Sequence, residues 1–335
     1  LEKHLPGQVK AFIADHNIKF YTIDGIKIGK EIGLGGRINT VLQSAFFKLA
    51  AIIPEETAIE LMKAAAKATY GKKGDKIVQM NYDAIDAGAK QVNAIEVPES
   101  WKNCEDEGLF TPEVKGGKDD VVAFVKNIQS KVNAQEGNTL PVSAFKDYVD
   151  GSTPSGTAAY EKRGIAVDIP IWQSETCIQC NRCAYVCPHA VIRPVALTED
   201  ELAKAPEGTK AIDMIGMPGL KFTMTVSAYD CTGCGSCANV CPVNNAGKKA
   251  PALVMTSFDD ETAKEQEKYD YLVQLAEKQE VLDKFKISTV KGSQFRKPYL
   301  EFSGACAGCG ETPYIKLVTQ LFGDRMYVAN ATGCT

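Results

Sequence analysis

The sequence predicts a multidomain chain that combines α/β and α+β regions, and three observations support this fold class. Helical periodicity alternates with short apolar strands over residues 1–120. Two similar cysteine runs, each flanked by apolar strands, lie within residues 165–285. A third cysteine group follows Gly292, where a further region begins. We therefore expect a trimmed α/β domain over 1–120, a helix and linker over 121–164, an α+β domain over 165–285 and the start of another α/β domain over 286–335.

The first region reads as a strand followed by three helices. Residues 17–23 form the strand, and residues 25–32 have helical spacing that ends at Gly33. Residues 54–70 are expected to form a helix that begins with a proline. Their acidic residues lie near the start and their lysines near the end, which are the positions that the helix dipole favours for these charges. Residues 76–92 continue the helical pattern. This mixture of a strand and helices indicates the α/β class for the first region.

The second region is expected to be a helix followed by a loop. Apolar residues recur at i, i+3 and i+4 over residues 121–132, which is typical of an amphipathic helix. Residues 151–156 read GSTPSG, a turn-rich linker. The chain then passes through Glu161, Lys162 and Arg163 toward the first cysteine run.

Eight of the twelve cysteines form two copies of one motif, C-x2-C-x2-C-x3-C-P. The first copy contains Cys177, Cys180, Cys183 and Cys187, and the second, 54 residues later, contains Cys231, Cys234, Cys237 and Cys241. This is the ligand run of bacterial two-cluster ferredoxins, in which the fourth thiolate of each run belongs to the other cluster. We therefore expect one [4Fe-4S] cluster on Cys177, Cys180, Cys183 and Cys241, and a second on Cys231, Cys234, Cys237 and Cys187.

Zinc and disulfides are the competing interpretations of these eight cysteines. Structural zinc usually takes two separated CxxC pairs or mixtures of Cys and His, not two runs of four cysteines. A chain of this length also does not resemble a small secreted disulfide scaffold. The pattern therefore favours iron–sulfur clusters, whose thiolates suit a reducing compartment and anaerobic metabolism.

The flanks of the two cysteine runs repeat as well. Residues 167–172 lead into the first run as residues 221–226 lead into the second. Apolar strands follow each run, at residues 191–197 and 252–256. The result is a pseudo-symmetric plan of strand, cluster loop, helix and strand, with residues 198–217 inserted between the halves as structural decoration. The two runs must therefore fold as one unit.

The composition excludes some classes of partner. The chain has 335 residues, of which 44% are hydrophobic and 24% charged, as in an ordinary globular protein. Its formal net charge is −4, and no run of Lys and Arg alternates with aromatic residues, so nucleic acid is not an expected partner. No stretch approaches the roughly 18 consecutive apolar residues of a membrane span, and the first residues lack an apolar signal segment. We expect a cytoplasmic protein with no membrane partner.

A third cysteine group lies near the end of the chain. Cys306 and Cys309 form a CxxC pair, and Cys334 lies 25 residues beyond Cys309. Zinc, a redox dithiol and part of a further cluster all use this spacing. In a chain that already carries two clusters, a third would extend an electron path, and its fourth ligand could follow Thr335. Cys104 is isolated and is interpreted as a plain thiol.

Three segments together resemble one enzyme family, the pyruvate:ferredoxin (flavodoxin) oxidoreductases. Residues 304–335, GACAGCGETPYIKLVTQLFGDRMYVANATGCT, are similar to the opening of that family's thiamine diphosphate and proximal-cluster domain. Residues 33–50, GLGGRINTVLQSAFFKLA, resemble its gamma-type domain, and residues 161–190, which begin EKRGIAVDIP, resemble the entry to its two-cluster ferredoxin-like domain. The resemblance covers nearly the whole chain.

The resemblance implies a large homodimer that converts pyruvate and coenzyme A to acetyl-CoA and carbon dioxide. Its cofactors would be thiamine diphosphate, Mg2+ and three [4Fe-4S] clusters, and its electron acceptor would be ferredoxin or flavodoxin. The third cluster would be held by Cys306, Cys309 and Cys334, with a fourth ligand outside the chain. The resemblance also places Glu311, Thr332 and Gly333 near thiamine diphosphate, and Gly35, Gly36 and Arg37 near coenzyme A.

Both of these weaker assignments have a simpler structural alternative. Glu311 precedes a helix that we expect over residues 312–322, and it could be a charge at the first turn of that helix. After this helix, residues 325–330 read as a strand. The turn that contains Gly35, Gly36 and Arg37 follows a helix and does not match G-x-G-x-x-G after a strand, so it could simply stop that helix.

The sequence departs from the complete family pattern. It lacks a GDG-type segment for the cofactor's diphosphate and Mg2+, and the amino-terminal pyruvate-binding domain is absent. We expect a piece of a longer polypeptide that conducts electrons but does not cleave pyruvate alone. The alternatives are a sibling enzyme that uses another 2-oxoacid, and a non-catalytic ferredoxin-like subunit of a different redox complex.

Overall fold

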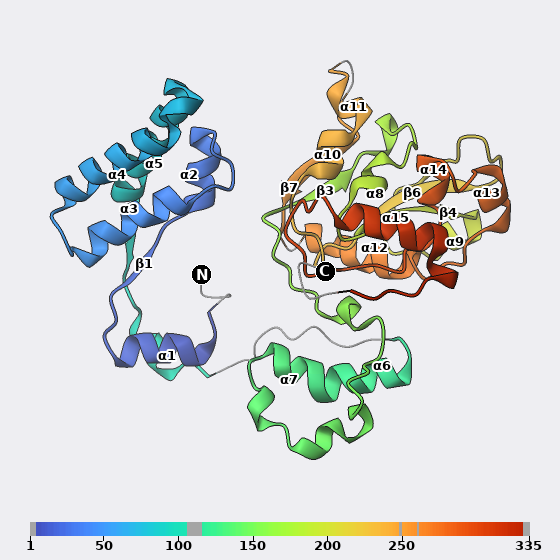
Figure 1. Cartoon of the computed structure of the whole chain (residues 1–335), viewed down its shortest axis with the longest axis horizontal. Coiled ribbons are helices and arrows are strands. Elements are labelled where there is room, and N and C mark those ends of the chain that lie inside the picture. The colour runs from blue at the N-terminus through green and yellow to red at the C-terminus, as the bar shows by residue number, and fades with distance from the viewer. Residues whose placement is uncertain (1–4, 106–115, 248–249, 260, 331–335) are drawn as a thin grey trace. The chain divides into compact units, whose positions relative to one another are not determined.

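The structure is a computed structural model that describes residues 5–105, 116–247, 250–259 and 261–330 (Figure 1). The chain divides into two compact units, Leu1–Thr111 and Pro112–Thr335. Both units mix helices and strands, which confirms the predicted fold class.

The first unit contains most of the long helices of the chain. Its elements are α1 (Gly7–Asp15), β1 (Phe20–Thr22), α2 (Gly25–Ile32), α3 (Asn39–Ala50), α4 (Glu55–Tyr70), α5 (Asp75–Lys90), β2 (Asn93–Ile95) and the 3-10 helix η2 (Glu99–Asn103). The strands β1 and β2 form a two-stranded antiparallel sheet in which Phe20 pairs with Ile95.

The sequence located three of the five α-helices given above and missed α1 and α3. The expected helix over 25–32 is α2, and those over 54–70 and 76–92 are α4 and α5, shifted by one or two residues. The sequence analysis did not identify α3, because its apolar side chains are not confined to one face. Phe46 is 53% exposed, while the polar Ser44 is buried.

The helices α3 and α5 pack unusually closely at Gly88. A Cβ atom added there would lie 2.3 Å from the carbonyl oxygen of Val41 and 2.9 Å from Cβ of Ser44. The Ser44 hydroxyl also donates a 2.6 Å hydrogen bond to the carbonyl of Ile85, so the two helices cannot easily move apart.

We expect Gly88→Ala to destabilise the pairing of α3 with α5 by about 1–3 kcal/mol, because overpacking against a backbone atom outweighs the better helix propensity of alanine. Hydrogen exchange of amides in α3 and α5 would measure the change in local opening free energy. Gly36→Ala is the matched control, since an added Cβ there meets nothing within 4 Å. Unchanged protection in Gly88→Ala would contradict the packing described here.

The second unit contains the cysteine runs between short strands and helices. Its elements begin with α6 (Asp119–Phe124), the π-helical η3 (Val125–Gln129), α7 (Ser130–Asn133), η4 (Gly137–Thr139), η5 (Val142–Tyr148), η6 (Thr157–Tyr160), β3 (Asp168–Trp172), α8 (Arg182–Val186), β4 (Ile192–Leu197), α9 (Glu199–Ala203) and β5 (Ile212–Asp213). They continue with β6 (Lys221–Val226), α10 (Ser236–Val240), α11 (Pro242–Asn245), β7 (Leu253–Ser257), η8 (Thr262–Lys264), α12 (Glu265–Leu272), α13 (Gln279–Lys284), α14 (Val290–Ser293), α15 (Thr312–Phe322) and η9 (Gly323–Arg325).

Two small antiparallel sheets tie the halves of the repeat together. The strand before the first cysteine run, β3, pairs with β7, which follows the second run; Pro170 lies opposite Met255. The strand after the first run, β4, pairs with β6, which precedes the second; Pro194 lies opposite Met224. The insertion contributes β5, which extends the second sheet beside β6. Each sheet therefore takes one strand from each half, and neither half is complete without the other.

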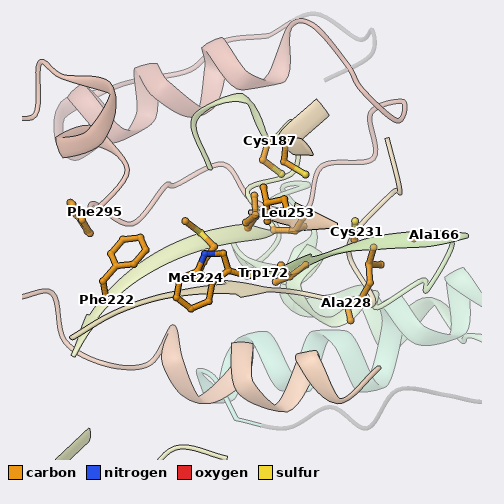
Figure 2. Packing of buried hydrophobic residues seen from close by; sticks show 14 of the residues in the cluster. Ala166, Trp172, Cys187, Phe222, Met224, Ala228, Cys231, Leu253 and Phe295 are labelled. Atoms are coloured by element: carbon orange, nitrogen blue, oxygen red, sulfur yellow. The ribbon is translucent and has the colours of Figure 1, made fainter. Parts of the chain in front are cut away.

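The core of the second unit runs from an aromatic group to the cysteine loops. Phe222 is fully buried and makes edge-to-face contacts with Trp172 and Phe295, with ring centroids 6.0 and 6.4 Å apart. Figure 2 shows these rings at one end of the cluster and Cys231 toward the other. Cys187 and Cys231 are buried members of the same cluster. Each cysteine run is thereby anchored in the core by a buried cysteine.

The expected strand over residues 325–330 is wrong. The structure has η9 over Gly323–Arg325, and residues 326–330 are irregular. Their apolar side chains suggested a strand, but Tyr327 is fully exposed and Val328 is 74% exposed. A strand needs a partner strand for its backbone hydrogen bonds, and none pairs with these residues in the described part of the chain.

Candidate metal centres

Two cavities in the second unit are each lined by four cysteines. One is lined by Cys177, Cys180, Cys183 and Cys241, and the other by Cys187, Cys231, Cys234 and Cys237. Each cavity takes three cysteines from one run and the fourth from the other, so the structure brings together the same two sets that the spacing predicted. Each has about 350 Å3 of empty space, part of which is open to solvent. The thiols surround a space instead of converging on a point: among the described residues, no three His, Cys, Asp or Glu side chains are grouped for a single metal ion.

The exchange of the fourth cysteine follows from two short helices. The helix α8 carries Cys183 and ends at Cys187, and α10 carries Cys237 and ends at Cys241. The two helices lie against each other. Because an α-helix rises about 1.5 Å per residue, each one holds its third and fourth cysteines roughly 6 Å apart along its axis. One of these thiols can therefore face each cavity.

Both loops use left-handed backbone at matching positions. Gly233 has φ of 68° in the second loop, and Gln179 has φ of 54° at the equivalent position of the first. In each loop this residue's N–H donates to the sulfur of the first cysteine, Cys231 or Cys177, at 3.4 Å. A backbone N–H aimed at a ligand sulfur stabilises its anionic form and helps set a cluster's potential.

Gln179 adopts this conformation because the insertion holds its side chain. Its Nε2 donates to the carbonyl of Asp213 at 2.7 Å, and the N–H of Ile215 donates to its Oε1 at 2.8 Å. The left-handed region is costly for a side chain other than Gly or Asn, and these two hydrogen bonds compensate. The insertion, interpreted from sequence as decoration, therefore supports the first cysteine loop.

Burial makes these thiols poor acids without a cationic partner. It raises the pKa of Cys231 and of Cys237 to about 12 and raises that of Cys183 well above its usual value. Bound iron offsets such a penalty, since a metal ion deprotonates a thiol that coordinates it. The all-sulfur donor sets, the cavities that they line and the N–H groups aimed at sulfur fit [4Fe-4S] clusters.

The CxxC pair of the third cysteine group lies at the start of α15. Cys306 is exposed and Cys309 is partly buried. The backbone N–H groups of Thr312 and Glu311 and the Thr312 hydroxyl lower the pKa of Cys309. Gly308 has φ of 72°, and the N–H of Glu311 donates to the sulfur of Cys309 at 3.4 Å, so this loop repeats features of the other two.

The third cysteine loop packs directly on the second. A Cβ added at Gly308 would lie 3.5 Å from Cβ of Cys234 and 3.8 Å from Oγ of Ser236. Cys334, together with Thr332 and Gly333, lies outside the described residues. The structure therefore places the loop that carries Cys306 and Cys309 next to the second cavity.

The two weaker candidate sites occupy turns at helix ends. Glu311 is exposed at the N-cap of α15, as its structural alternative expected. Gly33 is the left-handed C-cap of α2, and the exposed turn of Gly35, Gly36 and Arg37 follows it. These positions agree with a helix-start charge and a helix stop. The assignments to thiamine diphosphate and coenzyme A stay predictions.

A buried ion pair beside the second cavity was missed by the sequence analysis. Nζ of Lys162 lies 2.5 Å from Oδ2 of Asp230, with side-chain exposures of 18% and 5%. The Ser227 hydroxyl donates to the same oxygen at 2.5 Å, and the Lys162 ammonium lies 4.9 Å from the centroid of the Phe302 ring. The sequence did contain a signal for this pair. Asp230 directly precedes Cys231, and a carboxylate next to a buried cysteine needs a cation as its partner.

His189 lies at the second cavity, and Lys316 contacts the carbonyl of Cys187, one of the cysteines that line it. His189 lines that cavity and its Nδ1–H donates to the carbonyl of Ser303 at 3.1 Å; burial lowers its pKa. Lys316 is 1% exposed, and burial lowers its pKa to about 8, while nearby Cys187 and Cys183 raise it. The sequence signal for Lys316 was its place on the same face of α15 as Thr312 and Gln320.

Among the described residues, no helix has both the length and the apolar character that crossing a membrane requires.

Comparison with known proteins gave three family models along the chain. Residues 2–91 match pyruvate ferredoxin/flavodoxin oxidoreductase, residues 112–166 match EKR, a domain of unknown function, and residues 176–245 match a 4Fe-4S dicluster domain. The third match covers both cysteine runs.

Three curated relatives align with the whole chain. They are pyruvate:ferredoxin oxidoreductase of Moorella thermoacetica at 51% identity, pyruvate-flavodoxin oxidoreductase of Enterobacter agglomerans at 49%, and pyruvate dehydrogenase [NADP(+)] of Cryptosporidium parvum at 45%. The alignment covers 27% of each of the first two relatives and 18% of the third. The chain thus spans about a quarter or less of their length.

Proposed function

This chain belongs to the pyruvate:ferredoxin/flavodoxin oxidoreductase family, and we propose that it forms the electron-conducting segment of such an enzyme. The whole enzyme would convert pyruvate and coenzyme A to acetyl-CoA and carbon dioxide. The observation that carries the proposal is the pair of cavities, each lined by three cysteines of one run and the fourth cysteine of the other. Identity of 45–51% over the whole of this chain to enzymes whose names specify pyruvate supports this substrate.

The cysteines divide into three ligand sets. The first cluster would be held by Cys177, Cys180, Cys183 and Cys241, the second by Cys187, Cys231, Cys234 and Cys237, and the third by Cys306, Cys309 and Cys334 with a fourth ligand outside the chain. The chemistry that such clusters supply is the acceptance and release of one electron at a time. Oxidation of a 2-oxoacid releases two electrons, so one-electron acceptors must take them in two steps.

The packing of the loops suggests the order of the three sites. Gly308 of the third cysteine loop lies against Cys234 of the second cavity. The helix α8 then links the cavities, because it begins next to Cys183 of the first and ends at Cys187 of the second. The second cavity would thus lie between the other two sites along the path.

The remaining parts of the proposal rest on family resemblance. Glu311, Thr332 and Gly333 would approach thiamine diphosphate and Mg2+, whose site is completed by parts outside this chain. Gly35, Gly36 and Arg37 would contact coenzyme A. The enzyme would be a cytoplasmic homodimer of anaerobic metabolism, with ferredoxin or flavodoxin as electron acceptor.

The test is an assay of the full-length polypeptide that carries this segment. Coenzyme-A-dependent reduction of methyl viologen would be measured under anaerobic conditions with pyruvate, 2-oxoglutarate and indolepyruvate in parallel. We expect pyruvate to give the highest kcat/KM and a Cys177→Ser/Cys231→Ser variant to lose viologen reduction. A preference for another 2-oxoacid would point to a sibling enzyme, and no activity with any of the three would exclude the enzyme function.

A further inference from the structure

Lys316 is a buried cation on α15, a helix that buries polar side chains and exposes apolar ones. The helix α15 buries Thr312, Lys316 and Gln320, while Tyr314 on another face is 70% exposed. The Lys316 side chain is only 1% exposed. Burying an ammonium group is expensive unless its hydrogen bonds and its charge are compensated, so the surroundings of Lys316 must supply both.

The hydrogen bonds are supplied by the end of α8. Nζ of Lys316 donates to the carbonyl oxygens of Ala184, Tyr185 and Cys187; the bonds to Tyr185 and Cys187 are 3.0 and 3.3 Å long. An ammonium group has three protons, so these three carbonyls use all of its donors. The carbonyl end of a helix carries partial negative charge and favours a cation there.

The charge is not balanced by a carboxylate in the described part of the chain. The three hydrogen-bond partners of the Lys316 ammonium described above are neutral carbonyls. The nearby Arg193 is already paired with Glu301 at 3.0 Å and adds positive charge. Beyond the carbonyl end of α8, the cluster thiolates can compensate the charge of Lys316, since α8 carries Cys183 of the first cavity and is capped by Cys187 of the second, and both cysteines raise the pKa of Lys316.

We propose that Lys316 is an electrostatic bridge between the two cluster sites, whose fixed positive charge raises the reduction potential of both. This inference rests on the proposed cluster ligands. Reduction adds one electron, and thus one negative charge, to a site that already holds four thiolates. A buried ammonium beside both sites favours the reduced state of each, because local charge is one of the determinants of such potentials.

A purely structural role predicts a different result. If Lys316 only capped α8, its loss would weaken folding and cluster retention but would leave the potentials of the assembled clusters unchanged. Lys316→Met removes the charge and the donors, Lys316→Gln keeps two donors without the charge, and Lys316→Arg keeps the charge. These three variants separate charge from capping.

The experiment is a redox titration of the anaerobically reconstituted chain, with dithionite as reductant and EPR as readout. Each cluster is titrated alone, the first in a Cys231→Ser background and the second in a Cys177→Ser background. At the midpoint potential of the unsubstituted chain, Lys316→Met and Lys316→Gln should lower the reduced-to-oxidised ratio of both clusters about tenfold, a 59 mV shift for a one-electron couple. Lys316→Arg should restore the ratio to within about twofold.

Two other lysines serve as comparisons. Lys291, whose ammonium is coupled electrostatically to Cys180 and Cys177, should affect only the first cluster when changed to Met. Lys264, in an exposed ion pair with Glu261, should affect neither. Unchanged ratios in Lys316→Gln, or equal shifts in Lys316→Arg and Lys316→Met, would overturn the inference. Iron analysis comes first: a chain that binds no iron would refute the proposed cluster sites themselves, a separate outcome.

Discussion

Replacing Cys241 by serine should remove the cluster held by Cys177, Cys180 and Cys183, although Cys241 belongs to the other cysteine run. We expect the reconstituted chain to lose about four iron atoms, one [4Fe-4S] cluster. The physical reason is the geometry of α10, which ends at Cys241 and directs this residue to the cavity of the first run. Iron analysis and EPR of the reduced chain would measure the loss.

Double variants make this prediction specific to the pairing of the cysteines. Cys177→Ser/Cys241→Ser should lose no more iron than either single variant, because both thiols serve one cluster. Cys231→Ser/Cys241→Ser should lose about eight iron atoms, because each variant removes a different cluster. Cys104→Ser is the control and should lose none. If the two double variants exchanged these results, each run would hold its own cluster and the assignment would be wrong.

Lys162→Met should destabilise the second unit by about 3–5 kcal/mol, the usual cost of leaving one charge of a buried ion pair without its partner. The Asp230 side chain is only 5% exposed, so water cannot replace the Lys162 ammonium. Because Asp230 directly precedes Cys231, we also expect faster loss of the second cluster. Anaerobic urea unfolding, followed by the visible circular dichroism of the clusters, would measure both effects.

Asp230→Asn should rescue much of this loss in the Lys162→Met background. An amide can keep a hydrogen bond with Ser227, which lies 2.5 Å from the carboxylate, and carries no charge to bury. Lys264→Met is the matched control, since its pair with Glu261 is exposed and should contribute under about 1 kcal/mol. Equal stability of Lys162→Met and Lys264→Met would show that the buried pair does not stabilise this unit.

Local sequence signals located several of the longer helices and the strands that flank the cysteine runs. The strand β6 and the helices α2 and α15 have the boundaries that apolar periodicity and flanking residues indicated. The failures are equally informative. The helix α3 has apolar residues on more than one face, and residues 326–330 have strand-like composition without a partner strand. Periodicity reports which face can be buried, but it does not report whether another element is present to bury it.

The two copies of C-x2-C-x2-C-x3-C-P predicted which thiols share a site, because in this ligand pattern the fourth thiolate of each run belongs to the other cluster. In the structure each predicted set lines one cavity. Only the tertiary structure decided what surrounds them. Lys316 meets Ala184 across 132 residues, and Lys162 meets Asp230 across 68. Contacts between positions so far apart in the chain depend on how whole elements pack, and no local pattern of residue types specifies that packing.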